Sequence, residues 1–164
     1  MIYITVPLDV SHDRISFTCG KLLLDLYLQK QARQDVKRKL SACFILPSQN
    51  QIKAYYTLSA ASVERQVLPD EIIKKLPPSY IDLPAVLLGR LAVSNSYHRQ
   101  GLGEAMLIDA LKRSYYASSQ VGSMAVLVDP LDEEAKQFYE KYNFINLPDT
   151  GKMFLPMATI AQLF

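Results

Sequence analysis

Residues Leu87–Leu111 have the sequence LLGRLAVSNSYHRQGLGEAMLIDAL, and this segment decides the fold of the chain. Its first part is a nearly continuous apolar run up to Val93, which is typical of a strand covered on both faces. A polar turn at residues 94–96 interrupts the run, and Gly101 and Gly103 then open a segment whose apolar side chains repeat at helical spacing. The segment therefore predicts a strand, a glycine-containing turn and a helix.

A turn of this kind is suited to binding an anion. The N–H groups of a first helical turn have no partners within the helix, and the helix dipole favours negative charge there. Glycine lets the backbone approach a phosphate closely, because no Cβ stands in the way. The segment lacks the Lys-Ser/Thr pair of a P-loop and the third glycine of a dinucleotide-binding motif. We therefore expect a site for a diphosphate group without a metal ion.

The rest of the chain supplies strands and helices on both sides of this segment. Their order predicts a single domain over residues 1–164 with a mixed α/β sheet. Leu23, Leu24, Tyr27 and Leu28 are expected to form the buried face of the first helix. The expected elements are a strand at 2–6, a helix from about residue 21, a hairpin of strands at 42–46 and 52–59, a proline-rich connection at 67–84 with a helical turn at 70–75, a strand at 124–128, a helix at 132–142, and strands at 144–145 and 153–157.

Composition narrows the class of protein. The 164 residues are 49% hydrophobic and 21% charged, which is ordinary for a globular domain, and the net charge of +2 allows a nucleic-acid partner without requiring one. Because no secretory signal or membrane-spanning apolar run is present, we expect a cytoplasmic protein with no membrane contact. Cys19 and Cys43 match no metal or redox spacing and are expected to be buried free thiols.

A basic cluster lies after the first helical pattern. It consists of Lys30, Arg33, Lys37 and Arg38, of which the first three sit at helical spacing. One interpretation is a solvated helix face, and the other is a contact with the phosphate backbone of a nucleic acid. Charge alone favours the first.

One arginine interrupts the apolar strand before the glycine turn. Arg90 follows Gly89, and a buried arginine must find a partner. It could hold the sheet and the turn together, or it could contact a substrate. We expect the structural role.

Two segments resemble the GNAT N-acetyltransferase family. Residues 98–103, HRQGLG, are similar to the Arg/Gln-x-x-Gly-x-Gly/Ala loop that holds the pyrophosphate of acetyl-coenzyme A, with His98 where the family prefers Gln or Arg. Residues 138–144, FYEKYNF, resemble the family's Phe-Tyr-Glu-Lys-x-Gly-Phe segment, with Asn143 in place of a glycine that ends the helix. The order of elements agrees over nearly the whole chain. The resemblance implies the α/β (α+β) GNAT fold, a central mixed, mostly antiparallel sheet flanked by helices.

The resemblance also implies a cofactor and a catalytic residue. Acetyl-coenzyme A would be the cosubstrate, and Tyr139 matches the family's general acid, which protonates the departing thiolate; its alternative role is that of a core aromatic residue. No His–carboxylate pair suggests a base, and none is required for an α-amino group with a reference pKa of about 7.7–8.0. Asp132 can cap the helix that runs from it to Tyr142, and it stands where many members have asparagine near the cofactor. The residues expected to bind the cofactor are Leu91, Ala92, Val93, His98, Arg99, Gln100, Gly101, Leu102, Gly103, Glu104, Asp132 and Phe138.

Four further segments resemble a narrower group, the GNAT toxins of bacterial type II toxin–antitoxin pairs. They are residues 17–20, 31–35, 55–58 and 89–93. These toxins acetylate the free α-amino group of aminoacyl-tRNA and so block translation, and their partner is usually a ribbon-helix-helix antitoxin. The resemblance implies the same activity and partners here, with Lys30, Arg33, Lys37 and Arg38 as candidate tRNA contacts.

Two other functions stay open at this point. The chain could be a GNAT enzyme that acetylates a small amine or a protein N-terminus, in which case the basic cluster is only a solvated face. It could also be a catalytically silent GNAT-fold binding module, although the intact glycines and Tyr139 argue against this. The sequence does not identify the preferred amino acid or tRNA, nor does it decide whether the protein is a homodimer.

Overall fold

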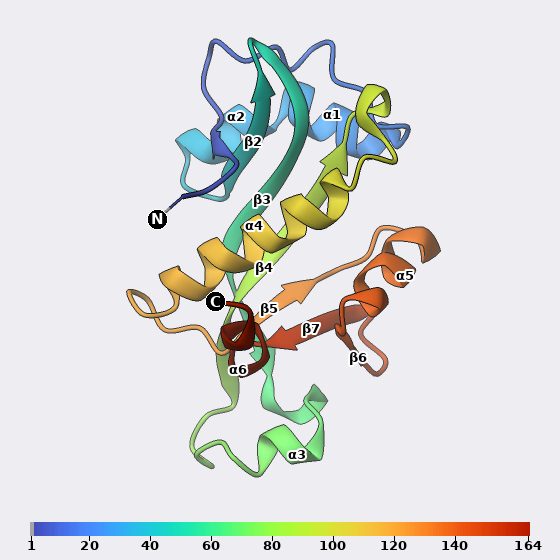
Figure 1. Ribbon diagram of the computed structural model, residues 1–164. Helices are drawn as coiled ribbons and strands as arrows, with labels where there is room; N and C mark the ends of the chain where they lie inside the picture. Colours follow the sequence, from blue (N-terminus) through green and yellow to red (C-terminus); the bar gives the residue numbers. More distant parts are fainter. Residues whose placement is uncertain (1) are drawn as a thin grey trace. The chain divides into compact units, whose positions relative to one another are not determined.

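The structure is a computed structural model, and it describes residues 2–164. Short 3₁₀ turns occur at Arg65–Val67, Asn95–Tyr97 and Ala161–Leu163. The helices and strands in chain order (Figure 1) are β1 (Val6–Pro7), α1 (Leu22–Lys30), α2 (Ala32–Lys37), β2 (Ala42–Ser48), β3 (Gln51–Glu64), α3 (Asp70–Ile73), β4 (Asp82–Val93), α4 (Leu102–Ala117), β5 (Ala125–Val128), α5 (Glu133–Lys141), β6 (Ile145–Leu147), β7 (Lys152–Pro156) and α6 (Met157–Ile160).

The strands follow the order β1-β2-β3-β4-β5-β7-β6 in a seven-stranded sheet. The pairs β1–β2, β2–β3, β5–β7 and β6–β7 are antiparallel, so the predicted mixed, mostly antiparallel sheet flanked by helices is confirmed. The chain divides into two compact units, each containing part of the long strands β3 and β4, and the single domain expected for residues 1–164 stays a prediction. The first unit comprises the described residues up to Ser59 with Leu88–Leu111, and the second comprises Ala60–Leu87 with Lys112–Phe164.

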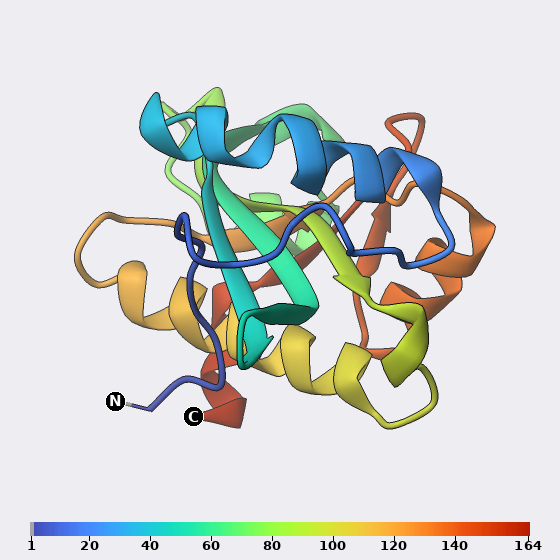
Figure 2. The ribbon, with the colours of Figure 1, turned by 90° about the horizontal axis from the view of Figure 1, so that it is seen from above.

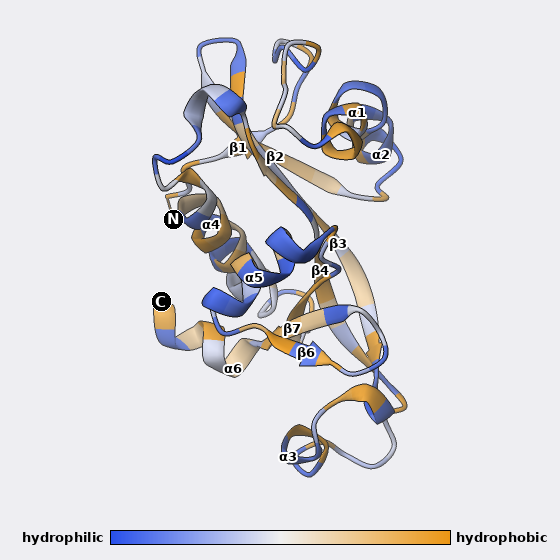
Figure 3. Cartoon of the chain, turned by 90° about the vertical axis from the view of Figure 1, so that its right-hand side faces the viewer, coloured by the Kyte–Doolittle hydropathy of each residue, from blue (hydrophilic) through white to orange (hydrophobic). Residues whose placement is uncertain are grey.

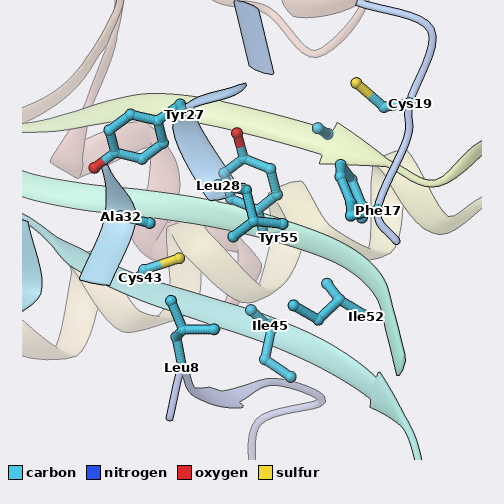
Figure 4. Packing of buried hydrophobic residues seen from close by; sticks show 11 residues of the cluster. Leu8, Phe17, Cys19, Tyr27, Leu28, Ala32, Cys43, Ile45, Ile52 and Tyr55 are labelled. Atoms are coloured by element: carbon cyan, nitrogen blue, oxygen red, sulfur yellow. The ribbon is translucent and has the colours of Figure 1, made fainter. Parts of the chain in front are cut away.

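The first unit has its core between its strands and the helices α1 and α2, while the first part of α4 lies on the opposite face of the strands (Figures 2 and 3). Tyr55 of β3 is central to this core (Figure 4). Its ring packs edge-on against that of Phe17, with 5.5 Å between the ring centres, and stacks on that of Tyr27, with 6.5 Å between the centres. Its hydroxyl donates a hydrogen bond to the carbonyl of Leu24 at 2.7 Å. The buried residues of this core are Leu8, Phe17, Cys19, Tyr27, Leu28, Ala32, Cys43, Ile45, Ile52, Tyr55 and Ala92.

One residue of the predicted buried face of α1 lies on the surface. Leu23 is 66% exposed, so that part of the prediction is wrong. Asp25 is buried instead, because its carboxylate accepts hydrogen bonds from the N–H of Cys19 at 2.8 Å and from the hydroxyl of Thr18 at 3.2 Å. The carboxylate fixes the preceding loop to the helix, and apolar periodicity does not detect such a role. The other predicted residues, Leu24, Tyr27 and Leu28, are buried or partly buried.

The first strand is shorter than predicted. Of residues 2–6, only Val6 belongs to β1, which pairs with β2. Before it, the N–H of Ile4, at 2.9 Å, and the hydroxyl of Thr5 both donate to the carboxylate of Asp109 in α4. A side chain of α4 thus supplies the acceptors that a neighbouring strand would otherwise supply.

The proline-rich connection of the second unit is mostly exposed, and Leu68 and Leu83 are its buried residues. The predicted helical turn is present as α3, and Arg65 holds the connection in place. Its guanidinium donates to four backbone carbonyls, those of Ile73, Leu76, Pro77 and Tyr80, at 2.6–3.4 Å. The buried residues of this core are Val63, Leu68, Leu83, Ala85, Ala125, Leu127, Leu147 and Phe154.

Most other predicted elements are present and differ from the prediction only in where they begin or end. The predicted hairpin is present, but β2 and β3 extend farther and leave a two-residue turn, in which Gln49 has φ +56°. The strand before the glycine turn begins earlier, at Asp82. The first predicted helix is broken at Gln31, so the basic cluster spans the end of α1 and all of α2.

Candidate functional site

The glycine turn of the first unit connects β4 to α4. After β4 ends at Val93, the N–H of Ser94 donates to the carbonyl of Lys53 at 2.8 Å, and the N–H of Asn95 donates to that of Thr18, also at 2.8 Å. These two bonds fix the start of the turn to β3 and to the loop before α1. Residues 98–101, by contrast, are exposed.

The backbone at the start of α4 fits an anionic group. The carbonyl of Gly101 accepts from the N–H of Ala105 at 3.1 Å, so Gly101 precedes the first helical turn, whose own N–H groups lack intrahelical partners. Gly101 has φ +76°, and a Cβ built on it would meet no heavy atom within 4 Å. The backbone is therefore open to a ligand at the point where the helix dipole favours negative charge. Gln100 and Glu104 are exposed beside it, and Leu102 and Gly103 are partly buried.

His98 and Arg99 have different roles in the turn. Nε2 of His98 lies 2.7 Å from the carbonyl oxygen of Val93, and because a carbonyl only accepts, this nitrogen carries the proton. His98 therefore closes the turn onto β4. Arg99 has φ +63°, a left-handed conformation that is uncommon for residues other than glycine, and its side chain is exposed.

The predicted cofactor residues of β4 lie just before this turn. Ala92 is buried in the core of the first unit, so only its backbone is available to a ligand. Leu91 and Val93 are partly buried. Since neighbouring residues of a strand point to opposite faces, Leu91 and Val93 lie on the face opposite to Ala92.

The second unit contains the other predicted residues, on and before α5. Asp132 caps this helix, since one of its carboxylate oxygens accepts from the N–H of Ala135 at 2.9 Å, as predicted. Asn143 ends the segment in the left-handed conformation, with φ +71°, which confirms that it replaces glycine there. The predicted cap and helix end are thus both present.

Tyr139 is held by aromatic neighbours. It is 7% exposed, and its ring packs against Phe138 at 5.3 Å and Phe144 at 5.2 Å. Within residues 2–164 its hydroxyl has no hydrogen-bond partner, whereas Thr57 Oγ1 is the one fully buried side-chain oxygen or nitrogen there that lacks a partner. The ring of Tyr139 is therefore fixed, while its hydroxyl is left without a protein partner in this part of the chain. Burial raises the pKa of Tyr139 above its ordinary value.

The basic cluster is a surface feature of the first unit. Lys30, Arg33, Lys37 and Arg38 are all exposed, and none of them forms an ion pair within the described residues 2–164; Arg33 is attracted at longer range by the carboxylate of Asp9. Arg33 and Lys37 also border a cavity of about 510 Å³ between α2 and the segment that follows β1. Exposed cations that form no ion pair remain available to an anionic ligand.

The remaining reactive side chains do not form a second site. Burial raises the pKa of the Cys19 thiol to about 11 and that of the Cys43 thiol to about 12, so both are protonated at neutral pH. Both are free and buried, as predicted. Residues 2–164 contain no cluster of His, Cys, Asp and Glu that could hold a metal ion, and no helix among them could cross a membrane.

Comparison with known proteins identifies the family. Residues 63–146, about half of the chain, match the acetyltransferase (GNAT) domain. A curated relative, the "tRNA-acetylating toxin" of Mycobacterium tuberculosis (strain ATCC 25618 / H37Rv), is 33% identical over 132 residues, which cover 80% of this chain and 78% of the relative. The chain belongs to the GNAT acetyltransferase family.

Solved structures agree with this assignment. The GNAT chain superimposes on "AtaT complexed with acetyl-methionyl-tRNAfMet" with a TM-score of 0.89 and 32% identity, covering 98% of both chains. It also matches a tyrosine-to-phenylalanine variant of AtaT "bound to the C-terminus of the antitoxin AtaR and Acetyl-CoA". The TM-score is 0.82 and the identity 28%, over 98% of this chain and 96% of the AtaT chain. The predicted family and fold are thereby confirmed.

The predicted cofactor-binding and catalytic residues of this GNAT chain fall into one group in each unit. The glycine turn and β4 bring one set together, and α5 brings together Asp132, Phe138 and Tyr139. Sequence analysis missed Tyr27, which it placed only in the core. Its ring lies under the guanidinium of Arg90, with Cζ 3.4 Å from the ring centre. The isolated arginine in an apolar strand signalled that a partner was needed, but nothing in the sequence pointed to this tyrosine.

Proposed function

We propose that this GNAT protein transfers the acetyl group of acetyl-coenzyme A to the α-amino group of aminoacyl-tRNA, and that it blocks translation in this way. The observation that carries the proposal is the similarity, over nearly the whole chain, to AtaT in complex with acetyl-methionyl-tRNAfMet. The similarity to the tRNA-acetylating toxin supports the same substrate. The alternative substrate is a small amine or a protein N-terminus.

The backbone of the glycine turn would hold the pyrophosphate of acetyl-coenzyme A. The open backbone at Gly101 and the free N–H groups of the first turn of α4 support this role. His98 supports the turn from within, and Leu91, Val93 and Phe138 would contribute apolar contacts. The cosubstrate supplies the activated acetyl group.

Tyr139 would donate a proton to the thiolate that leaves during transfer. Its fixed ring and the absence of a hydrogen-bond partner for its hydroxyl within residues 2–164 suit this role. The raised pKa keeps the hydroxyl protonated at physiological pH, so the acid form is always present. The attacking α-amino group has a reference pKa of about 7.7–8.0 and is partly neutral without a base.

The pH dependence of turnover follows from these two groups. We expect kcat to rise as the α-amino group loses its proton and then to stay level to about pH 9, because Tyr139 loses its proton only above its raised pKa. Single-turnover rates of aminoacyl-tRNA acetylation, measured over a range of pH, test this pH dependence. An alkaline decline below about pH 9 that disappears in Tyr139→Phe would contradict it.

The basic cluster supports an RNA substrate. A small amine needs no such surface, whereas an acceptor stem presents closely spaced phosphates. We expect a variant with Lys30, Arg33, Lys37 and Arg38 all changed to Gln to acetylate aminoacyl-tRNA more slowly, while its affinity for acetyl-coenzyme A is unchanged. Each lost phosphate contact should reduce the slope of log K against log salt by about 0.9. The measurement is tRNA binding and acetylation across roughly 50–200 mM salt.

A matched control removes four other exposed charges of the chain. Lys74, Lys75, Lys141 and Lys152 are exposed lysines of the second unit, and changing all four to Gln alters the net charge equally. We expect this control to keep most of the salt slope. Equal losses in both variants would mean that only net charge matters, and no loss in either would make the cluster a solvated face.

The proposal extends to partners and location. The AtaT structure with the C-terminus of AtaR supports an antitoxin partner, which we propose is a small ribbon-helix-helix protein. We propose that the enzyme acts in the cytoplasm, where aminoacyl-tRNA is found, and a homodimer is compatible with this function. Co-expression with a small protein encoded beside it, followed by co-purification, tests the antitoxin.

A further inference from the structure

Arg90 is a partly buried charge close to the glycine turn. It lies in β4 directly before the strand residues 91–93, and its side chain is partly buried. Within residues 2–164 no carboxylate pairs with its guanidinium, and none of its N–H groups has a hydrogen-bond acceptor. The guanidinium lies over the ring of Tyr27, with Cζ 3.4 Å from the ring centre. Tyr27 covers one face of the guanidinium by stacking, but the N–H donors at the edge of the guanidinium make no hydrogen bond within residues 2–164.

Two contacts fix the tyrosine beneath Arg90. Its hydroxyl donates to the carboxylate of Asp35 at 2.8 Å, and its ring stacks on that of Tyr55 at 6.5 Å and 18° (Figure 4). Tyr55 is fixed in turn by its hydrogen bond to the carbonyl of Leu24. The Asp35 carboxylate accepts from Tyr27 and forms no ion pair with Arg90. The result is a guanidinium presented in a defined orientation, which is the geometry that proteins use for bidentate binding of phosphate.

The position of Arg90 separates it from the pyrophosphate turn. Arg90 and Ala92 share one face of β4, and Ala92 belongs to the core beneath α1. Helix α4, whose first turn follows Gly101, lies on the other face of the first-unit strands (Figures 2 and 3). A phosphate bound by Arg90 is thus approached from the α1 face of the strand and not from the α4 face.

We propose that Arg90 binds a phosphate of the single-stranded 3′ end of the tRNA, with Tyr27 as the residue that orients it. This inference rests on the proposed function, since it assigns part of the acceptor site for the same reaction. The donors of Arg90 match a phosphate, and the terminal nucleotides must reach β4 if their aminoacyl group is to react beside residues 91–93. The phosphates of acetyl-coenzyme A have the same chemistry, and the experiment separates the two sources.

The test combines an arginine variant with a shortened RNA. Arg90→Met removes the charge and keeps an apolar stem on the ring of Tyr27. Arg14→Met is the matched control, since Arg14 is also a partly buried arginine of the first unit but already donates to the Gln29 carbonyl at 2.7 Å. Each protein is titrated with intact uncharged tRNA, with tRNA lacking its terminal CCA, and with acetyl-coenzyme A, at several salt concentrations.

We expect Arg90→Met to bind intact tRNA about tenfold more weakly, the effect of losing a charged hydrogen bond. Its salt slope should fall by about 0.7, the value for one phosphate of a single strand. On tRNA without CCA, it should match wild type, and its affinity for acetyl-coenzyme A should be unchanged. Arg14→Met should behave as wild type throughout. Arg90→Lys, which keeps the charge without the planar fork, should retain most of the salt slope and lose affinity.

Three results would overturn the assignment. A loss of acetyl-coenzyme A affinity in Arg90→Met would place the cofactor's phosphate there, and equal losses on both RNAs would show a general charge effect. Unchanged tRNA binding in folded Arg90→Met and Arg90→Lys would leave Arg90 with a structural role only. If wild type binds tRNA but acetylates none when it is charged, the proposed function fails, and this outcome does not depend on the Arg90 variants.

Discussion

Replacing Tyr139 by phenylalanine is expected to slow acetyl transfer by about 10²- to 10⁴-fold, the usual contribution of a general acid. Only the hydroxyl is removed, and that hydroxyl has no hydrogen-bond partner within residues 2–164. The ring contacts with Phe138 and Phe144 remain, so thermal stability and the affinity for acetyl-coenzyme A should be preserved. Single-turnover acetylation of aminoacyl-tRNA with saturating acetyl-coenzyme A measures the step directly.

Tyr142→Phe provides the matched control on the same segment. Tyr142 lies at the C-terminal cap of α5 and packs edge-on against Phe138 at 5.1 Å, and it is partly exposed. We expect this variant to transfer acetyl groups at a rate within about threefold of wild type. That change is much smaller than the one expected when a general acid is lost. If Tyr139→Phe is as active as this control, Tyr139 is a core aromatic residue and another group, or water, protonates the thiolate.

Replacing Gly103 by valine is expected to weaken acetyl-coenzyme A binding by about 10- to 100-fold. Gly103 lies in the first turn of α4, where a branched side chain would obstruct the approach of a diphosphate to the backbone N–H groups. Hydrogen bonds to a charged group contribute about 1.5–3 kcal/mol each, which sets the size of the effect. Calorimetric titration with acetyl-coenzyme A measures the affinity.

Gly122→Val tests whether the effect is specific to the turn. A Cβ at Gly122 would meet nothing within 4 Å, and this glycine lies in the loop between α4 and β5. The affinity of this control should equal that of wild type. An unchanged affinity in a folded Gly103→Val variant would exclude the turn as the phosphate site and would remove the main support for the cofactor residues at 98–104.

The sequence was informative where local chemistry decides the structure. The glycine turn, the Asp132 cap and the left-handed Asn143 were predicted because each depends on residues within one turn of the chain. The first strand was predicted wrongly because a contact distant in sequence decides it, and Leu23 was predicted wrongly because a polar residue takes a buried position of the same helix. Asp109 binds a backbone 105 residues away. Asp25 occupies a buried position by accepting hydrogen bonds from the loop before its helix.

The same distinction between local motifs and distant contacts holds for the candidate site. Residues that act through a contiguous motif, such as those of the turn and Tyr139, could be identified from their order alone. Tyr27 and Arg90 lie 63 positions apart, and apolar periodicity assigned Tyr27 only to the core. Their stacking depends on how α1 packs on β4, and this packing is a property of the fold and not of either segment. The exposure of the basic cluster was likewise decided only by the structure.

The most direct test of the account identifies the atom that receives the acetyl group. Wild-type protein is incubated with acetyl-coenzyme A and either charged or deacylated tRNA, and the RNA is then digested with nuclease and analysed by mass spectrometry. We predict N-acetylaminoacyl-adenosine from charged tRNA and no acetylated nucleoside from deacylated tRNA. The absence of that product, together with acetylation of a small amine or a peptide N-terminus by the same active preparation, would contradict the account.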